Sequence, residues 1–284
     1  MLVRIDGVDL AYDEAGAGPA VVLVHAGLAD RRMWEHQFAA LARDHRVIRY
    51  DWRGYGGSGD AAGSFAHHED LLALLDALDV GRATLVGCSM GAAHAVDVAL
   101  TAPDRVAGLV LICPGLSGHR WPAEMLAEVR EQVHSAVPAD RLQRYHRHAA
   151  GEIVPDDVTA MAQAQVAFMV VGPGRARADI DPAVWDRAVM MCERVFERLW
   201  SGPGAVEREL EPPARARLHE ISAPALVING RSDVRYVQAV ADILTEGISG
   251  ARRIDLADTG HLAPLERATE VTAALTELLA GGAR

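Results

Sequence analysis

Gly87-Cys88-Ser89-Met90-Gly91 is the stretch that decides the fold of this chain. It follows the apolar run 83–86 and precedes an alanine-rich helical pattern over 92–100. A Gly-x-Ser-x-Gly pattern between a strand and a helix predicts a turn so sharp that the serine hydroxyl stands clear of the sheet. The two glycines lack the Cβ atoms that would collide across such a turn. The N–H groups that open the helix point to the same place, so they stabilise negative charge that develops there.

Three more apolar runs end close to residues that complete such a site. Residues 20–25 lead into Ala26-Gly27-Leu28, residues 225–230 precede Asp233, and residues 252–256 precede Thr259-Gly260-His261. Serine, acid and histidine in this chain order are typical of the α/β-hydrolases. Residues 51–58, Asp-Trp-Arg-Gly-Tyr-Gly-Gly-Ser, also resemble the Asp-x-Arg-Gly-x-Gly-x-Ser loop of that superfamily. The chain therefore resembles the α/β-hydrolase superfamily over residues 1–113 and about 220–284.

The resemblance implies a catalytic triad with a role for each member. Ser89 is then the nucleophile, His261 the general base, and Asp233 the acid that orients His261 and stabilises its charged form. Asp233 has a second interpretation, because an aspartate in this position can also cap the helix expected from Arg235. The family often has proline shortly after this acid, and this chain has Val234-Arg235-Tyr236-Val237 instead.

The resemblance also implies an oxyanion hole, formed by the backbone N–H groups of Gly27 and Met90. The family usually has His-Gly-x after its third strand, whereas this chain has His25-Ala26-Gly27. Trp34, nine residues after the histidine, also matches the family and supports this register. We expect His25 to anchor the loop rather than to act as an acid or base.

Alternating strand and helix patterns predict an α/β fold with a mostly parallel eight-stranded sheet and helices on both faces. The strands are expected near 2–5, 9–13, 20–25, 46–50, 83–88, 106–113, 224–230 and 251–256. The helices are expected near 34–43, 66–79, 89–101, 235–246 and 265–280. The alternation stops at Pro114-Gly115 and resumes near 221–224. We therefore expect a core domain of residues 1–114 and 219–284, and a helical cap of residues 115–218 inserted after the sixth strand, with 205–217 as its return linker.

Composition narrows the classes of function. The net charge of −11 disfavours nucleic acid as a partner, and no apolar run approaches the length of a membrane span. All 28 basic residues are arginine, which excludes lysine Schiff-base chemistry and Walker-type phosphate loops. Three cysteines in apolar contexts and an N-terminus without an apolar signal core predict a cytoplasmic protein. No cofactor and no metal are expected, and the sequence carries no pattern that sets an oligomeric state.

Two features are read as structural. His67-His68-Glu69-Asp70 resembles a metal-binding run, but four consecutive residues point around a helix, so we expect the polar start of a helix. The expected cap carries apolar stripes at helical spacing, which normally bury against neighbours. These stripes are Trp121, Met125 and Val129; Met161, Gln165, Phe168 and Met169; and Trp185, Val189, Cys192 and Phe196. One of them must also face the serine, which favours a substrate with a sizeable apolar part.

The sequence predicts a cofactor-independent serine hydrolase that cleaves a small-molecule carboxylic ester or lactone through an acyl-enzyme on Ser89. A C–C bond hydrolase, or a biosynthetic cyclase or acyltransferase, would use the same triad. Cofactor-free perhydrolase chemistry is a further possible side activity. A ligand receptor of this fold with little turnover belongs to a different class. The serine at position 89 argues against the epoxide hydrolase and haloalkane dehalogenase branches of the superfamily, which use aspartate there.

Overall fold

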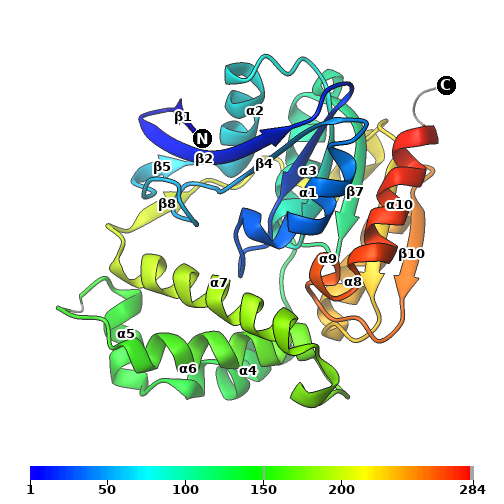
Figure 1. Ribbon diagram of the computed structural model, residues 1–284. Coiled ribbons are helices and arrows are strands. Elements are labelled where there is room, and N and C mark those ends of the chain that lie inside the picture. The colour runs from blue at the N-terminus through cyan, green and yellow to red at the C-terminus, as the bar shows by residue number, and fades with distance from the viewer. Residues whose placement is uncertain (150, 282–284) are drawn as a thin grey trace.

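The computed structural model describes residues 1–149 and 151–281 of the chain. Its centre is an eight-stranded sheet in the order β1-β2-β4-β3-β6-β7-β9-β10 (Figure 1). The sheet is parallel from β4 to β10, whereas the N-terminal strands are antiparallel: β1 pairs with β2, and β2 pairs with β4. Its strands are β1 (Leu2–Ile5), β2 (Val8–Ala15), β3 (Ala20–Val24), β4 (Arg46–Tyr50), β6 (Ala83–Cys88), β7 (Val106–Ile112), β9 (Ala225–Gly230) and β10 (Arg252–Leu256). The fold class expected from the sequence is confirmed.

Helices cover both faces of the sheet because its strands bury side chains on both sides. Along β3, Val21 and Leu23 belong to one apolar cluster and Val22 and Val24 to the other, as expected from the two-residue period of a strand. The first cluster includes side chains from α1 (Glu35–Leu41), α9 (Ala263–Glu266) and α10 (Ala268–Gly281). The second includes side chains from α2 (His67–Ala77), α3 (Met90–Thr101) and α8 (Arg235–Gly247). The sheet therefore separates two apolar clusters, one under the helices of each face.

The chain between β7 and β9 is mostly helical, as the sequence predicts. It holds α4 (Ala123–Gln132), α5 (Ala139–His146), α6 (Pro155–Val166), the π-helix η4 (Ala167–Val171) and α7 (Pro182–Ser201). In Figure 1, α7 lies between the sheet and the other three helices. Short 3₁₀ turns complete the fold: η1 (Arg31–Trp34), η2 (Pro103–Arg105), η3 (His134–Ala136), η5 (Arg177–Asp179), η6 (Ala214–Ala216) and η7 (Leu218–Glu220).

Two details differ from the sequence-based prediction. The expected helix 265–280 is two helices, because Arg267 leaves the helical region at φ −128° and ψ 52° between α9 and α10. The expected return linker contains a strand, β8 (Ala205–Glu207), which pairs in parallel with β5 (Gly63–Phe65). Both strands have only three residues, and β8 is exposed throughout, so neither shows the alternation that predicts a strand.

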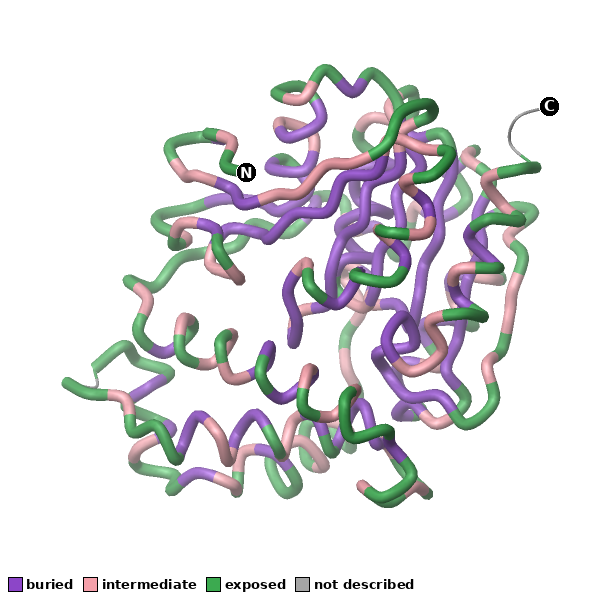
Figure 2. Tube along the Cα trace, viewed as in Figure 1, coloured by how far each residue is buried: buried purple, intermediate pink, exposed green. Residues whose placement is uncertain are grey.

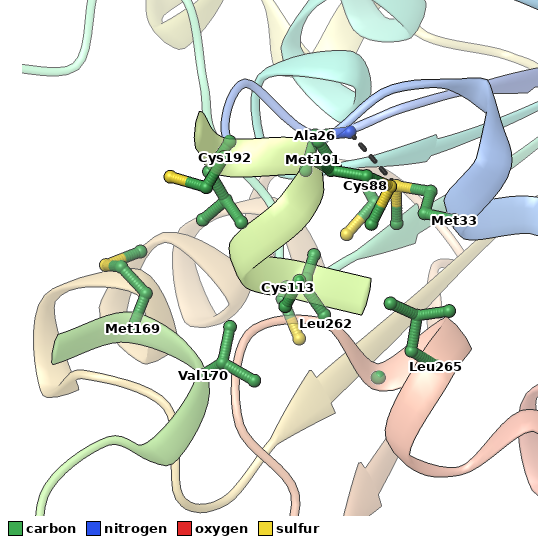
Figure 3. Close-up of a cluster of buried hydrophobic side chains, with 14 of the residues drawn as sticks. Ala26, Met33, Cys88, Cys113, Met169, Val170, Met191, Cys192, Leu262 and Leu265 are labelled. Atoms are coloured by element: carbon green, nitrogen blue, oxygen red, sulfur yellow. Dashed lines mark hydrogen bonds between the residues drawn. The ribbon is translucent and has the colours of Figure 1, made fainter. Parts of the chain in front are cut away.

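The helical insertion packs on the sheet through sulfur-containing and aliphatic side chains. Figure 3 shows Met191 and Cys192 of α7 and Met169 of η4 gathered over Cys88 and Cys113 at the ends of β6 and β7. Figure 2 shows buried and exposed residues alternating along the insertion, whereas the central strands β3, β4, β6, β7 and β9 are buried almost throughout. The expected apolar stripes are therefore used for packing: Met161, Phe168, Met169, Val189 and Cys192 are buried, and Trp121, Met125, Val129, Trp185 and Phe196 are partly buried against the same cluster.

Candidate active site

Ser89 occupies the strained turn that its motif predicts. Its backbone has φ 55° and ψ −122°, a conformation that a non-glycine residue rarely adopts. A Cβ on Gly87 would lie 2.3 Å from the carbonyl oxygen of Gly91, and a Cβ on Gly91 would lie 2.4 Å from the carbonyl oxygen of His25. Glycine is thus required at both places because the backbone of the turn passes too close for any side chain.

The strained conformation of Ser89 is held by backbone hydrogen bonds on both sides. Its N–H donates to the carbonyl of Ile112 at 2.9 Å, and its carbonyl accepts the N–H groups of Gly115 at 2.8 Å and Ala92 at 2.9 Å. The serine is partly exposed, in contrast to the fully buried Cys88 before it. The turn therefore holds the residue rigidly and leaves it accessible.

Asp233 and His261, predicted from separate loops, lie side by side. His261 Nδ1 is 2.6 Å from Asp233 Oδ2, and both side chains are buried. Asp233 Oδ1 accepts the N–H of Val234 at 2.7 Å, so the carboxylate is satisfied on both oxygens. His261 Nε2 is buried and has no hydrogen-bond partner among residues 1–149 and 151–281. The Asp233 contact orients the ring so that Nε2 is available to accept a proton.

The His261 loop is attached to the neighbouring strand ends and to the helical insertion. Cys88 Sγ lies 3.6 Å from the His261 carbonyl, and Cys113 Sγ lies 3.5 Å from the carbonyl of Gly260. The His261 N–H donates to the carbonyl of Met169 in η4 at 3.2 Å. Ser89, which follows Cys88, and His261 are thus brought to the same edge of the sheet.

A buried ion pair that sequence reasoning missed fixes the same loop. Arg175 and Glu266 pair at 2.9 Å, with 11% and 6% of their side chains exposed. Glu266 Oε1 accepts the N–H of Gly260 at 2.9 Å, while Arg175 donates to the carbonyls of Val171 at 2.7 Å and Asp258 at 2.8 Å. The pKa of Glu266 is raised, chiefly by burial. No motif marks the two residues, because they are 91 positions apart and meet only in the folded chain.

The two predicted oxyanion-hole residues are neighbours. Met90 is the first residue of α3, where backbone N–H groups have no acceptor within the helix. A Cβ on Gly27 would lie 2.6 Å from the sulfur of Met90, so this position accepts only glycine unless Met90 moves. Glycine at 27 thus lets the two loops approach closely.

His25 anchors its loop, as expected. Trp52 donates its backbone N–H to His25 Nε2 at 3.2 Å, so Nε2 is the acceptor and Nδ1 carries the hydrogen. Nδ1 then donates to the carbonyl of Ala26 at 2.9 Å. The ring stacks on Trp52 with centroids 4.2 Å apart, and burial lowers its pKa. Because both ring nitrogens of this neutral histidine are in hydrogen bonds, neither is free to accept a proton.

The loop after β4 is also structural. Asp51 accepts the N–H groups of Arg31 and Gly57, each at 2.8 Å, and Ser58 donates to the Asp51 carbonyl at 2.6 Å. Gly56 has φ +46°, and its Cβ would overlap the Asp51 carboxylate. The motif residues thus hold the loop together through the Asp51 carboxylate and carbonyl.

The run that begins α2 is more buried than expected. His67, His68 and Asp70 are all buried, and Asp70 pairs with Arg53 through Nε at 2.6 Å.

The three cysteines are free and buried, and burial raises the pKa of Cys88 and Cys113. Among the helices that the structure describes, none is both long and apolar enough to cross a bilayer.

Comparison with known proteins agrees with the fold. A sequence model of the family described as "alpha/beta hydrolase fold" matches residues 19–145. Epoxide hydrolase A of Mycobacterium tuberculosis is 30% identical over 99% of this chain and 97% of its own length. From the same organism, the protein named non-heme bromoperoxidase BpoC is 29% identical over 96% of this chain and 98% of its own. The enol-lactonase from Burkholderia xenovorans superposes with a TM-score of 0.73, 25% identity, and coverage of 99% of this chain and 100% of the lactonase. The chain therefore belongs to the α/β-hydrolase family, and its relatives support a hydrolase activity.

Proposed function

We propose that the chain is a serine hydrolase that cleaves carboxylic esters or lactones with a sizeable apolar part. The observation that carries this proposal is the Asp233–His261 pair, with a free Nε2, at the sheet edge that also presents Ser89 in a strained, accessible turn. A carboxylate, an imidazole and a hydroxyl in these roles are the components of covalent acyl transfer.

In the proposed mechanism, His261 Nε2 takes the proton of the Ser89 hydroxyl as its oxygen attacks the substrate carbonyl. The N–H groups of Met90 and Gly27 stabilise the oxyanion, and the protonated His261 then gives its proton to the leaving alcohol. Water, deprotonated by His261 in turn, hydrolyses the acyl-enzyme. Asp233 keeps the hydrogen on Nδ1 and stabilises the imidazolium. No step requires a cofactor.

The substrate class follows from the surroundings of the serine. We propose that residues 115–218 form a cap domain over the core domain of 1–114 and 219–284. The cap contributes Met169, Met191 and Cys192 to the apolar cluster that reaches Cys88. Met90, beside Ser89, is 39% exposed. Methionine side chains adapt to varied apolar shapes, which supports substrates with a substantial apolar part. The likeness to an enol-lactonase supports a lactone as well as an open-chain ester.

The residue at position 89 separates this proposal from epoxide opening. The epoxide hydrolase branch of the superfamily uses an aspartate at the elbow, whose carboxylate attacks the epoxide carbon. This chain has serine there despite its 30% identity to epoxide hydrolase A. A serine alkoxide suits a carbonyl substrate instead, because the oxyanion hole stabilises the tetrahedral intermediate that forms.

The test is labelling of the full chain with a fluorophosphonate together with turnover of a panel of p-nitrophenyl esters and lactones of increasing acyl length. We expect one labelled serine, Ser89, and turnover that rises with apolar length. Labelling without turnover of any ester or lactone would favour the ligand receptor, the C–C hydrolase or a biosynthetic cyclase or acyltransferase instead. Absence of fluorophosphonate labelling would exclude the serine mechanism.

Peracid formation is a second candidate, because the full-length relative BpoC is named a non-heme bromoperoxidase. Hydrogen peroxide would attack the same acyl-enzyme in place of water, so the products would be a peracid and free Ser89. The peracid, released into solution, would oxidise bromide. Bromide-dependent bromination in the presence of acetate and peroxide, lost in Ser89→Ala, would support this activity. Bromination that survives in Ser89→Ala would reject it.

A further inference from the structure

Two buried histidines outside the proposed triad have unused ring nitrogens. His67 opens α2 and His94 lies on α3, and each side chain is only 4% exposed. Their rings lie 4.8 Å apart between centroids. His67 Nδ1 and His94 Nε2 are buried without a hydrogen-bond partner in the part of the chain that the structure describes. A buried polar atom without a partner costs free energy, so a ligand that satisfies both rings would be bound favourably.

Glu207 of β8 completes a group of three possible ligands. One ligand atom from each of His67, His94 and Glu207 lies within 4.8 Å of the other two. A cavity of about 230 Å³, lined in part by His67 and Glu207, lies beside them. The cavity gives water and small ions a route to the group.

The charges around the group favour a cation. A metal ion binds the neutral form of an imidazole, and both histidine rings are buried beside each other and the Trp52 ring. Each neutral ring has one nitrogen with a free lone pair. The two arginines that line the same cavity are already paired, Arg53 with Asp70 and Arg198 with Asp60.

We propose that His67, His94 and Glu207 bind a divalent transition-metal ion, with Zn²⁺ the best chemical match. Two imidazole nitrogens and one carboxylate are a donor set that zinc prefers, with water from the cavity as a fourth ligand. Zinc bonds of about 2.0–2.2 Å place tetrahedral ligand atoms about 3.3–3.6 Å apart. The three side chains must therefore draw together, and Glu207, long and on an exposed strand, has the freedom to do so.

The proposed site joins three separate elements. His67 comes from α2, His94 from α3, and Glu207 from the strand that follows α7. An ion there would fasten the returning end of the helical insertion to α3, whose first residue directly follows Ser89. Its role would be stabilisation, and it does not depend on the proposed hydrolase function.

The experiment uses the full chain, stripped with a chelator and titrated with ZnCl₂ by calorimetry. Bound zinc is then counted after gel filtration. We expect one zinc per chain and a rise in Tm on binding. Glu207→Gln and His94→Gln should each weaken binding by roughly tenfold or more, since each removes a ligand. The matched controls Glu209→Gln and His68→Gln, on the same two segments as the ligands Glu207 and His67, should leave the affinity unchanged.

Absence of saturable zinc binding would overturn the proposal. Saturable binding that Glu207→Gln leaves unchanged would overturn it equally, and Glu207 lies on the surface, so this variant keeps the fold. Substitution with Co²⁺ gives an independent readout, because four-coordinate cobalt absorbs visible light strongly and should lose that signature in Glu207→Gln. Ester turnover separates the two proposals, since removal of zinc should change the initial rate by less than about twofold if the triad acts alone.

Discussion

The carboxyl edge of the sheet and the helical insertion above it are built by different rules. At the sheet edge, α3 buries all its residues from 91 to 100, and Ser89 before it is held in a conformation that few sequences tolerate. In the insertion, α4 (Ala123–Gln132) buries none of its ten residues. Its Met125 and Val129 are only partly buried against the apolar cluster. One region needs particular residues at particular positions, whereas the other needs only apolar side chains at helical spacing.

This difference decides which part of the molecule tolerates substitutions without loss of activity. Substitutions at the sheet edge should act on chemistry through a few atoms, whereas substitutions in the insertion should act gradually through packing.

Ser89→Ala should have the largest effect on activity. The substitution removes the proposed nucleophile and leaves only the proposed oxyanion hole and substrate binding, so esterase activity should fall by about 10⁴ or more. The turn itself is shaped by Gly87 and Gly91, so Tm should hardly change. Initial ester rates and fluorophosphonate labelling measure the effect, with Ser232→Ala as a control at the same edge. Retained labelling of Ser89→Ala would show that the nucleophile is elsewhere.

Asp233→Asn should cost nearly as much, at a typical factor of about 10⁴ in kcat. The amide would donate toward His261 Nδ1 and so hold the ring in the wrong tautomer. The matched control is Asp181→Asn in the insertion. Asp181 caps α7 by accepting the Ala183 N–H at 2.7 Å, and asparagine caps a helix equally well. If Asp233→Asn and Asp181→Asn retained the same kcat, Asp233 would be a capping residue. The sheet edge would then be no more sensitive than the insertion at this position.

Arg175→Met should show how far the two regions depend on each other. It removes the cation that joins η4 to the His261 loop and leaves Glu266 buried without its partner. A displaced loop would misplace His261, the proposed base, so we expect kcat to fall on the order of tenfold to a hundredfold with a smaller change in KM. Tm should also fall, because breaking a buried pair is costly.

Arg175→Met combined with Glu266→Gln should recover part of the lost Tm, because the uncompensated charge is gone. The Gln side chain can still accept the Gly260 N–H, so part of kcat should return as well. If the pair were purely structural, Tm and kcat would fall and recover in parallel across the parent and these two variants. Arg175→Met with normal kcat would show that the loop holds its position without the insertion.

Asp97 should give the smallest effect, a change in the pH dependence of stability. Burial raises its pKa to about 7, and Ser117 donates to its Oδ2 at 2.6 Å. Between about pH 4 and 7 the native state keeps a proton that the unfolded chain releases. The free energy of unfolding therefore falls as pH rises through this window. Asp97→Asn removes the titration, so denaturant unfolding at pH 5 and pH 8 should differ less than in the parent. An unchanged difference would show that Asp97 is already ionised at pH 5.

The sequence predicts the sheet and the site residues because both leave local traces. Parallel strands buried on two faces appear in the sequence as continuous apolar runs. The turn around Ser89 requires glycine at positions 87 and 91, because the backbone passes too close there for a side chain. Arg175 and Glu266 left no such trace, since an arginine and a glutamate far apart in the chain are ordinary surface residues until folding pairs them. The strand β8 also left no trace, because three residues that are all exposed do not show the alternation of apolar and polar side chains that predicts a strand.

The hydrogen bond from the His261 N–H to the Met169 carbonyl has a kinetic consequence. A movement that lifts η4 from the sheet would remove the acceptor that holds the backbone of His261, the proposed base. Opening of the insertion near η4 and full activity would then exclude each other, so a molecule opened there to admit a bulky ester would be catalytically idle until it closed. For such substrates the rate of closing would set an upper limit on turnover, whereas small esters that enter without that movement would not meet this limit.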